Sequence, residues 1–254
     1  MDLGLSGRRA LVTGASMGIG LRTAETFAAE GCDVWLVARG ASLLGEVAER
    51  IHTRHGVEVH AVPADLSRSE EVDRVWDSVP TPDILVNNAG AIPSGSIHDV
   101  DEETWREAWD LKVLGYVNLC RRAMADMSER GSGVIVNVIG GGGEKPTPGY
   151  IAGAGGNAAL MAITRALGSN SLRTGVRVVG VNPGLIHTPR LESLMRSAAE
   201  RRWGDPERWR ELLDQRFPPG QPEHIADAVV FLASDRSANT TGTIVTVDGG
   251  GTAR

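Results

Sequence analysis

Residues 9–20 read Arg-Ala-Leu-Val-Thr-Gly-Ala-Ser-Met-Gly-Ile-Gly, a short apolar run followed by three spaced glycines. This spacing is typical of a strand that turns tightly into a helix. Gly14 permits the turn, Gly18 keeps a Cβ away from an approaching pyrophosphate, and Gly20 lets the helix pack closely on the strand. The amphipathic stretch 21–30 continues the helix, whose first N–H groups and dipole favour an anion. We therefore predict a dinucleotide site here.

The composition fits a globular protein with one large core. The chain has 254 residues, 41% of them hydrophobic, and a net charge of -6. This acidic balance argues against nucleic acid or an acidic membrane surface as the partner, and favours a small or nucleotide-like ligand. The first residues lack the pattern of a signal peptide, and no apolar run approaches the ~18 residues of a membrane span. We expect a cytoplasmic protein that forms a single domain, residues 1–254.

Cysteine and histidine give no sign of a disulfide or a metal site. Cys32 and Cys120 are isolated from each other and from any CxxC spacing, which predicts two buried free thiols. His52, His55 and His60 have no carboxylate or thiol at ligand spacing on the same element. We therefore expect no metal.

Apolar runs of strand length alternate with segments of helical periodicity. The runs lack an alternation of apolar and polar residues, as expected for strands that are covered on both faces. Strands that alternate with helices predict right-handed βαβ crossovers. The sequence thus predicts an α/β fold with one doubly wound parallel sheet of about seven strands, flanked by helices. The expected strands are 10–12, 34–38, 57–62, 84–86, 134–138, 176–181 and 244–247.

Two long helical segments, 102–128 and 156–173, follow the fourth and fifth strands. They carry more apolar positions than one sheet face needs. In this architecture they are the natural surface for self-association, so we expect a homotetramer or homodimer.

Residues 190–215 differ in texture from the rest of the chain, with mixed charges and a Gly-Asp-Pro break between two helical patterns. The segment is interpreted either as a helical lid over the substrate or as a solvated excursion that Trp203 and Trp209 anchor to the body.

Small and polar residues follow several of the strands. Asp65 is placed to accept a hydrogen bond from an adenine amino group, or else begins a helix. The Asn-Asn-Ala-Gly stretch at 87–90 lets main chain approach a ribose. Residues 182–184, Asn-Pro-Gly, end the sixth strand, and Thr188 is placed to bind a carboxamide or a phosphate. Residues 247–250 close the last strand.

Taken in this order, the motifs resemble those of the short-chain dehydrogenase/reductase family, from about residue 5 to residue 250. The resemblance implies a Rossmann-type fold, a nicotinamide cofactor and often a homotetramer built through the two long helices. The cofactor residues that it implies are Gly14, Gly18, Ile19, Gly20, Asp65, Asn87, Ala89, Gly90, Pro183, Gly184 and Thr188. Three neighbours complete the expected cofactor site: Ser16, Met17 and Leu66.

The end of the second strand indicates which nicotinamide cofactor binds. A carboxylate at this position accepts the ribose hydroxyls of NAD, whereas a cation suits the 2′-phosphate of NADP. Here Ala38 takes the acidic position and Arg39 follows it, with a planar fork suited to phosphate. The sequence favours NADP(H) over NAD(H); the alternative is an Arg39 that only stacks on the adenine.

The catalytic positions of the family do not match. The family has a Ser after the fifth strand that orients the carbonyl, a Tyr that transfers the proton, a Lys four residues later, and an Asn in the preceding long helix. In the register without gaps, these positions hold Gly140, Gly153, Asn157 and Lys112. A gapped register aligns Tyr150 with the tyrosine, but puts Ala154 in the lysine position and still supplies no Ser. The ungapped register is preferred because a helix turns by ~100° per residue, so a shift would spoil its apolar face.

Three residues remain as catalytic candidates, namely Tyr150, Lys112 and Asn157. Lys112 and Asn157 look like an exchange between the Asn and Lys positions, which would bring an ammonium in from the opposite helix. Tyr150 lies one turn before Gly153 and would face a similar direction, ~4.5 Å along the axis, if the helix begins early enough. The alternative interpretations are a surface lysine and a packing tyrosine.

Weaker candidates lie nearby. His187 precedes Thr188 close to the expected nicotinamide, and Glu144 and Lys145 either reach the site from a loop or pair with each other. Glycines at 140–143, 153, 155 and 156 predict a roomy cleft with mobile walls, unless another segment fills it.

The leading interpretation is an NADP(H)-dependent oxidoreductase that transfers a hydride to or from a carbonyl, imine or alkene, with an atypical active site. A non-redox lyase or isomerase, and a catalytically silent NADP(H)-binding protein, are the alternatives. In each case the partner is a small molecule.

Overall fold

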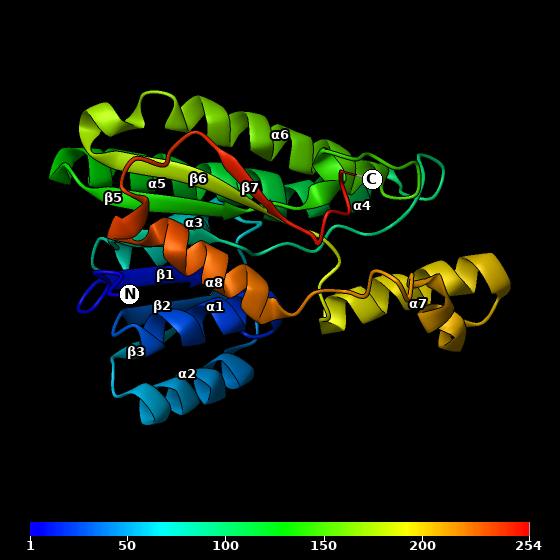
Figure 1. Cartoon of the computed structure of the whole chain (residues 1–254), viewed down its shortest axis with the longest axis horizontal. Coiled ribbons are helices and arrows are strands. Elements are labelled where there is room, and N and C mark those ends of the chain that lie inside the picture. The colour runs from blue at the N-terminus through cyan, green and yellow to red at the C-terminus, as the bar shows by residue number, and fades with distance from the viewer. Residues whose placement is uncertain (254) are drawn as a thin grey trace.

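The computed structural model describes residues 1–253, and its seven strands form one parallel sheet in the order β3-β2-β1-β4-β5-β6-β7 (Figure 1). The strands are β1 (Arg9–Thr13), β2 (Asp33–Ala38), β3 (Val59–Pro63), β4 (Ile84–Asn87), β5 (Gly133–Val138), β6 (Val176–Pro183) and β7 (Ile244–Val247). This confirms the predicted doubly wound α/β sheet. The order reverses between β1 and β4, and ligands of such sheets bind outside the carboxyl ends of the strands at this point.

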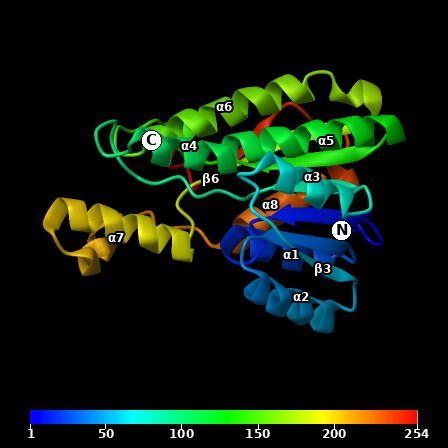
Figure 2. The same ribbon diagram turned by 180° about the vertical axis from the view of Figure 1, so that it is seen from behind.

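Helices cover both faces of the sheet (Figures 1 and 2). On one face α1 (Gly18–Ala29), α2 (Ala41–His55) and α8 (Pro222–Ala233) pack against a buried apolar cluster. On the other face, α3 (Ser69–Asp77) and α5 (Gly115–Arg130) pack on a second cluster, and α6 (Ile151–Gly168) lies beyond α5. Two-sided burial explains why the strands carry no polar face.

The two long helical segments differ in detail from those expected. The first is divided into α4 (Glu102–Trp109), a π-helical segment η1 (Asp110–Leu114) and α5. The second begins at Ile151 rather than near residue 156, and ends at Gly168 before a short 3-10 segment. A π-helical turn holds one more residue than an α-helical turn, and such insertions are frequent at functional sites. It also changes which side chains of the helix face α6.

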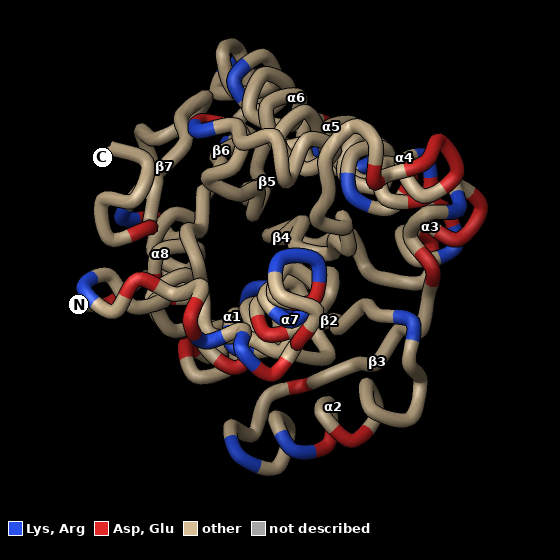
Figure 3. Tube along the Cα trace, turned by 90° about the vertical axis from the view of Figure 1, so that its right-hand side faces the viewer, with Lys and Arg blue, Asp and Glu red and all other residues tan. Residues whose placement is uncertain are grey.

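The segment expected as a lid or an excursion forms a helical hairpin. It consists of α7 (Pro189–Trp203) and the 3-10 segment η4 (Pro206–Leu212), and it projects from the end of the sheet (Figures 1 and 2). Trp209 is buried, whereas the Trp203 ring lies under the guanidinium groups of Arg202 and Arg208. Figure 3 looks onto this end of the molecule and shows cationic and acidic residues mixed along the hairpin.

Candidate functional site

The glycine turn between β1 and α1 depends on the absence of side chains. Gly14 and Gly18 have φ of 65° and 59°, a region that favours glycine. A Cβ on Gly20 would overlap the carbonyl oxygen of Gly14, and a Cβ on Gly14 would lie 2.9 Å from Asn88 Nδ2. The turn therefore leaves a cradle of main chain that fits the pyrophosphate of a dinucleotide. Ser16, Met17 and Ile19 lie in this turn and at the start of α1.

Two residues that the sequence did not single out hold this cradle against β4. The Thr13 hydroxyl accepts hydrogen bonds from the main-chain N–H groups of Asn88 (2.8 Å) and Ala89 (3.0 Å). Asn88 returns a bond from Nδ2 to the Thr13 carbonyl, at 2.9 Å. These bonds join the carboxyl ends of β1 and β4, so Gly14 and Ala89, both predicted cofactor residues, lie side by side. The signal available in the sequence was a pair of polar residues, Thr13 and Asn88, at the ends of two expected strands.

Thr188 is brought to the glycine turn from far along the chain. Its side chain accepts a hydrogen bond from the N–H of Leu191 and caps α7. A Cβ on Gly18 would lie 3.3 Å from Thr188 Cγ2. Before Thr188, Pro183 ends β6, and Gly184 lets main chain pass Asp248, which a Cβ would approach to 2.6 Å. The carboxyl ends of β1, β4, β6 and β7 thus enclose the predicted cofactor site.

At the adenosine end, Arg39 is exposed at the end of β2 and Asp65 follows β3. Partial burial alone would raise the pKa of Asp65, but hydrogen bonds from the N–H and hydroxyl of Ser67 outweigh it and, with Arg39, lower the pKa. Asp65 is therefore an ionised acceptor beside a cation. Leu66 is buried in the core, which leaves it only main-chain contacts with a ligand.

Asn87 was predicted as a cofactor residue, but its side chain is bonded within the core. Its side chain is buried, and Nδ2 donates to Asn137 Oδ1 at 2.9 Å, while Asn137 donates to the Thr164 hydroxyl. This chain of hydrogen bonds lies between β4, β5 and α6 and stabilises the core beneath the site. Asn87 Oδ1 has no partner within residues 1–253.

Lys112 lies in the π-helical segment and points toward the end of β5. Its Nζ donates to the carbonyl oxygen of Ile139 at 2.6 Å, and a Cβ on Gly90 would lie 2.8 Å from its Cδ. Burial lowers the pKa of Lys112 to about 7, and the nearby guanidinium of Arg190 lowers it in the same direction. Lys112 is half-buried rather than exposed, and its ammonium is bonded to main chain at the end of β5, so it is not the free surface cation of the alternative interpretation.

Asn157 is buried on α6 and faces the same loop. A Cβ on Gly140 would lie 3.0 Å from Asn157 Nδ2, and within the described chain Asn157 Oδ1 has no partner. Lys112 is bonded to residue 139 and Asn157 lies against residue 140. The structure thus brings the two residues of the expected exchange to adjacent points on the chain.

Tyr150 is the residue before α6, with φ of -142° and ψ of 39°, so it is not helical. The sequence placed Tyr150 one helical turn before Gly153 on condition that the helix includes residue 150. Because α6 begins at Ile151, this condition is not met. Its ring instead folds over Gly153, where a Cβ would overlap the ring carbon Cζ, and it lies against Gly142, where a Cβ would be 3.2 Å from Cδ1. The phenol ring therefore occupies the volume that a side chain at residue 153 would take. No hydrogen bond joins Tyr150 to Lys112 in the part of the chain described.

The roomy cleft that the glycines predicted is not what forms there, because neighbouring groups fill the space. The Tyr150 ring covers Gly153, and a Cβ on Gly143 would lie 2.7 Å from Met161 Cε. A Cβ on Gly156 would lie 3.2 Å from Val113 Cγ2. Several of these glycines thus allow close packing of the β5–α6 loop, α6 and η1.

The weaker candidates do not gather at this point. Glu144 accepts hydrogen bonds from Asn182 Nδ2 (3.0 Å) and from the Thr246 hydroxyl, which directs it to β6 and β7. Lys145 donates to the Gly251 carbonyl at 3.4 Å. His187 is exposed, and its main-chain N–H is bonded to Gly220.

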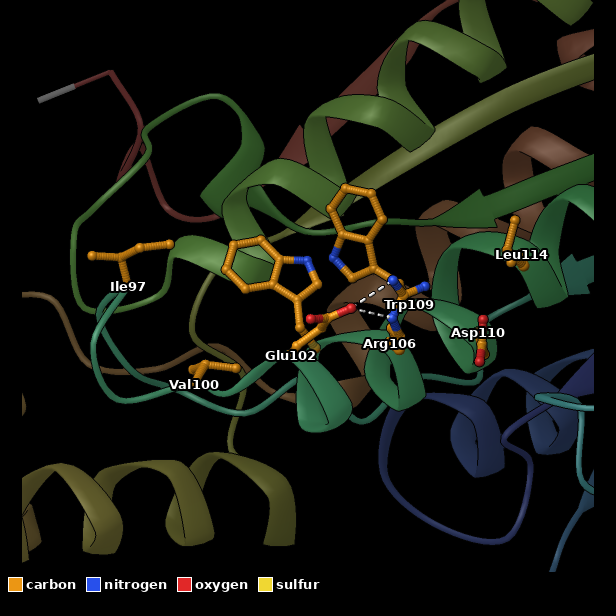
Figure 4. Close-up of a pocket in the computed structure, with 8 residues that line it drawn as sticks. Ile97, Val100, Glu102, Arg106, Trp109, Asp110 and Leu114 are labelled. Carbon is orange, nitrogen blue, oxygen red and sulfur yellow. Dashed lines mark hydrogen bonds and ion pairs between the residues drawn. The ribbon is translucent and has the colours of Figure 1, made fainter.

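A cavity of about 520 Å³ lies elsewhere, on the outer side of α4 (Figure 4). Its walls include Ile97, Trp109 and Leu114, and a Glu102–Arg106 ion pair lies at its edge. It contains none of the predicted cofactor or catalytic residues.

Residues 1–253 contain no cluster of three metal-ligating side chains. Across the same residues, no helix has the length and apolar character needed to cross a membrane. Cys32 and Cys120 are both buried free thiols, as expected.

A parallel sheet with a glycine-rich first turn at its switch point defines a Rossmann-type α/β protein. A family model described as Enoyl-(Acyl carrier protein) reductase matches residues 14–252. The chain belongs to the short-chain dehydrogenase/reductase family and is an oxidoreductase of that family.

Similar proteins cover the whole chain. An uncharacterized oxidoreductase of Thermotoga maritima is 33% identical, over 99% of this chain and 100% of its own. L-xylulose reductase of Bos taurus is 32% identical over 98% of each chain. The crystal structure of L-sorbose reductase from Gluconobacter frateurii, complexed with NADPH and L-sorbose, has a TM-score of 0.89 at 34% identity over 98% of each chain.

Proposed function

We propose that this protein is an NADP(H)-dependent reductase of a small carbonyl, imine or alkene compound, with Tyr150 as its proton donor. The similarity to L-sorbose reductase, solved with NADPH, supports the cofactor, as does the exposed Arg39 beside Asp65. When bound, NADPH supplies the hydride. The protein then has to hold the substrate, exclude water and deliver a proton.

The observation that carries this proposal is the Tyr150 ring in the volume above Gly153. The family resemblance places a catalytic tyrosine at residue 153. A side chain that begins three residues earlier and folds over a glycine delivers a phenol to the same region. The hydroxyl of Tyr150 donates its proton to the substrate oxygen, or to nitrogen or carbon in the other two classes.

Lys112 and Asn157 complete this site. An ammonium near a phenol stabilises the phenolate that remains after proton donation. Lys112 reaches the end of β5 from η1 instead of from α6, and its low pKa lets it exchange a proton near neutral pH. The unpartnered Oδ1 of the buried Asn157 is an acceptor for a water or a substrate donor.

The hairpin formed by α7 and η4 serves as the lid in this proposal. It begins at Thr188, which lies against Gly18, and hydrogen bonds from Arg190 to Ile92 and from Arg201 to Ser94 connect it to the β4–α4 loop. Its buried Trp209 keeps the hairpin together as a unit. Residues 190–215 would therefore move as one body over a bound substrate.

Self-association is also part of the proposal. The cavity on α4 is lined by exposed Ile97 and Leu114 and by two tryptophans, Trp105 and Trp109. An apolar surface of this kind is typical of an interface. A homotetramer or homodimer buries it, and light scattering at micromolar concentration tests this: a monomer alone would contradict it.

The test of the function is NADPH oxidation with a panel of ketones, imines and activated alkenes, compared between wild type and Tyr150→Phe. Wild type should turn over at least one class, and Tyr150→Phe should lose most of the rate while NADPH affinity, measured by tryptophan fluorescence, stays unchanged. Product without net NADPH oxidation would instead identify a lyase or isomerase. NADPH binding without product from any compound would identify a silent binding protein.

A further inference from the structure

We propose that Lys112 and Arg190 together bind a carboxylate of the substrate, so that the compound reduced is a short oxo acid. This inference rests on the proposed function and names the substrate class of the same site. Its basis is the convergence of two cations, from different elements, on three consecutive residues of the β4–α4 loop.

Gly90 and Ile92 mark the two ends of this short stretch. The stem of Lys112 lies against Gly90, where a Cβ would be 2.8 Å from Cδ. Arg190, in the first turn of α7, donates from Nη2 to the Ile92 carbonyl at 2.7 Å. Their proximity also appears in the electrostatics, because Arg190 contributes to the lowered pKa of Lys112. The two positive charges repel each other, so an anion bound between them would stabilise both.

Neither cation has an acidic partner in the structure of residues 1–253. Lys112 donates to a carbonyl oxygen, and so does Arg190. The contrast with the rest of α7 is informative, because Arg196 is paired with both Glu192 and Glu207. Arg190 is exposed, so a ligand can reach the remaining donors of its guanidinium.

The same loop fixes the position of the proton donor. Gly95 N–H donates to the Gly149 carbonyl at 2.7 Å, and Gly95 forms an isolated parallel bridge with Tyr150. The Tyr150 ring also packs on the small apolar cluster that includes Ile92. A carboxylate held over residues 90–92 therefore lies beside the residue that donates the proton. This favours a compound whose carboxylate is adjacent to the carbonyl, and disfavours a long chain between the two.

A matched pair of substrates tests the inference directly, namely 2-oxobutanoate and butanone, which differ in the carboxylate. Wild type should favour the oxo acid in kcat/KM by at least about tenfold, the range expected for a charge-assisted contact. Arg190→Gln should reduce that ratio about ten- to hundredfold. Arg201→Gln is the matched control, because Arg201 lies on the same helix and bonds to Ser94 of the same loop, yet its change should leave the ratio unaltered.

Binding provides a readout that is independent of turnover. Calorimetric titration of the NADPH-saturated protein with oxamate, an unreactive carboxylate, should show binding to wild type that is lost in Arg190→Gln and in Lys112→Met. Saturation with NADPH occupies the phosphate sites, so competition there is excluded.

The outcomes separate the two proposals. If oxamate binds in this pattern but no carbonyl compound is reduced, the anion site stands and the proposed function is wrong. If ketones are reduced with no preference for the oxo acid, or if Arg201→Gln changes the ratio as much as Arg190→Gln, the anion site is wrong and the reductase stands.

Discussion

The glycine turn at residues 14–20 and the β5–α6 region at 139–157 lie at the same end of the sheet, yet they are built in opposite ways. In the turn, the main chain forms the predicted binding cradle, and no side chain fits at residue 20, since a Cβ there would overlap the Gly14 carbonyl. In the second region glycine at 153 leaves a vacancy, and the ring of Tyr150 fills it. A cradle made of main chain requires glycine at particular positions. A reacting side chain, by contrast, can be supplied from a neighbouring position in the sequence.

The strongest test of this difference is Gly20→Ala. The added Cβ meets backbone rather than a flexible side chain, so we expect a loss of about 3 kcal/mol or more in the free energy of unfolding, together with loss of NADPH binding. Urea denaturation and fluorescence titration measure the two. Gly45→Ala is the control, because nothing lies within 4 Å of a Cβ there and α2 should gain about 0.5–1 kcal/mol. A Gly20→Ala protein with normal stability and affinity would show that the turn is not constrained.

The second test addresses the substituted tyrosine. Tyr150→Phe should lower kcat about 10²- to 10⁴-fold, the usual contribution of a positioned proton donor. Gly153→Ala should have a comparable effect, because the new methyl group takes the place of the ring. Adding Lys112→Met to Tyr150→Phe should cost little more than either change alone, since groups that act as a unit lose function non-additively.

The matched control for Gly153→Ala is Gly149→Ala, where a Cβ meets nothing within 4 Å. Its kcat should equal that of wild type. Full turnover in both Gly153→Ala and Tyr150→Phe would rule out Tyr150 as the donor.

A smaller effect is expected at the adenosine end. If Arg39 faces the 2′-phosphate as predicted, Arg39→Ala should lower NADPH affinity about ten- to hundredfold while NADH affinity changes little. Titration of both cofactors by tryptophan fluorescence measures this. Equal losses for the two cofactors would mean that Arg39 only stacks on the adenine.

The last test concerns Lys112 and the pH dependence of stability. The pKa of Lys112 is lowered from 10.5 to about 7 in the folded protein, so between these values the unfolded chain binds more protons. Stability therefore rises with pH across this window, and below about pH 7 the full penalty applies. The free energy of unfolding of Lys112→Met, measured relative to that of wild type, should therefore be higher at about pH 7 than at about pH 9.5. Urea denaturation at both pH values measures this difference. A difference that does not vary with pH would contradict the lowered pKa of Lys112.

Local patterns in the sequence were sufficient for the sheet and the turn. Strand alternation predicted seven strands, and the expected boundaries differ from those observed by a few residues, as for 57–62 against Val59–Pro63. The glycine spacing and the order of polar residues after each strand led to the family. These features depend on backbone conformation and burial over a few residues, which composition and periodicity record directly.

The catalytic end could be predicted only in part. The sequence predicted Tyr150, Lys112 and Asn157 as catalytic candidates, with Lys112 and Asn157 as an exchanged pair, and these roles remain predictions. It gave no sign of the π-helical turn that carries Lys112. Thr13 and Asn88 were visible as polar residues at the ends of two strands, but the sequence did not show that they bond β1 to β4. The sequence left open whether another segment fills the space beside the glycines, and in the structure the Tyr150 ring and neighbouring side chains fill it.

By itself, the sequence determined an acidic Rossmann-type oxidoreductase with a glycine-rich turn after its first strand, and it predicted a dinucleotide site there and a catalytic set that departs from its family. Only the tertiary structure decided that the Tyr150 ring covers Gly153, that Lys112 reaches the end of β5, and that Arg190 comes to Ile92. The physical reason is the range of the interactions. A glycine turn is set by torsion angles within a few residues, whereas these contacts depend on one non-helical residue, one extra residue in a helical turn, and the packing of segments far apart in the chain.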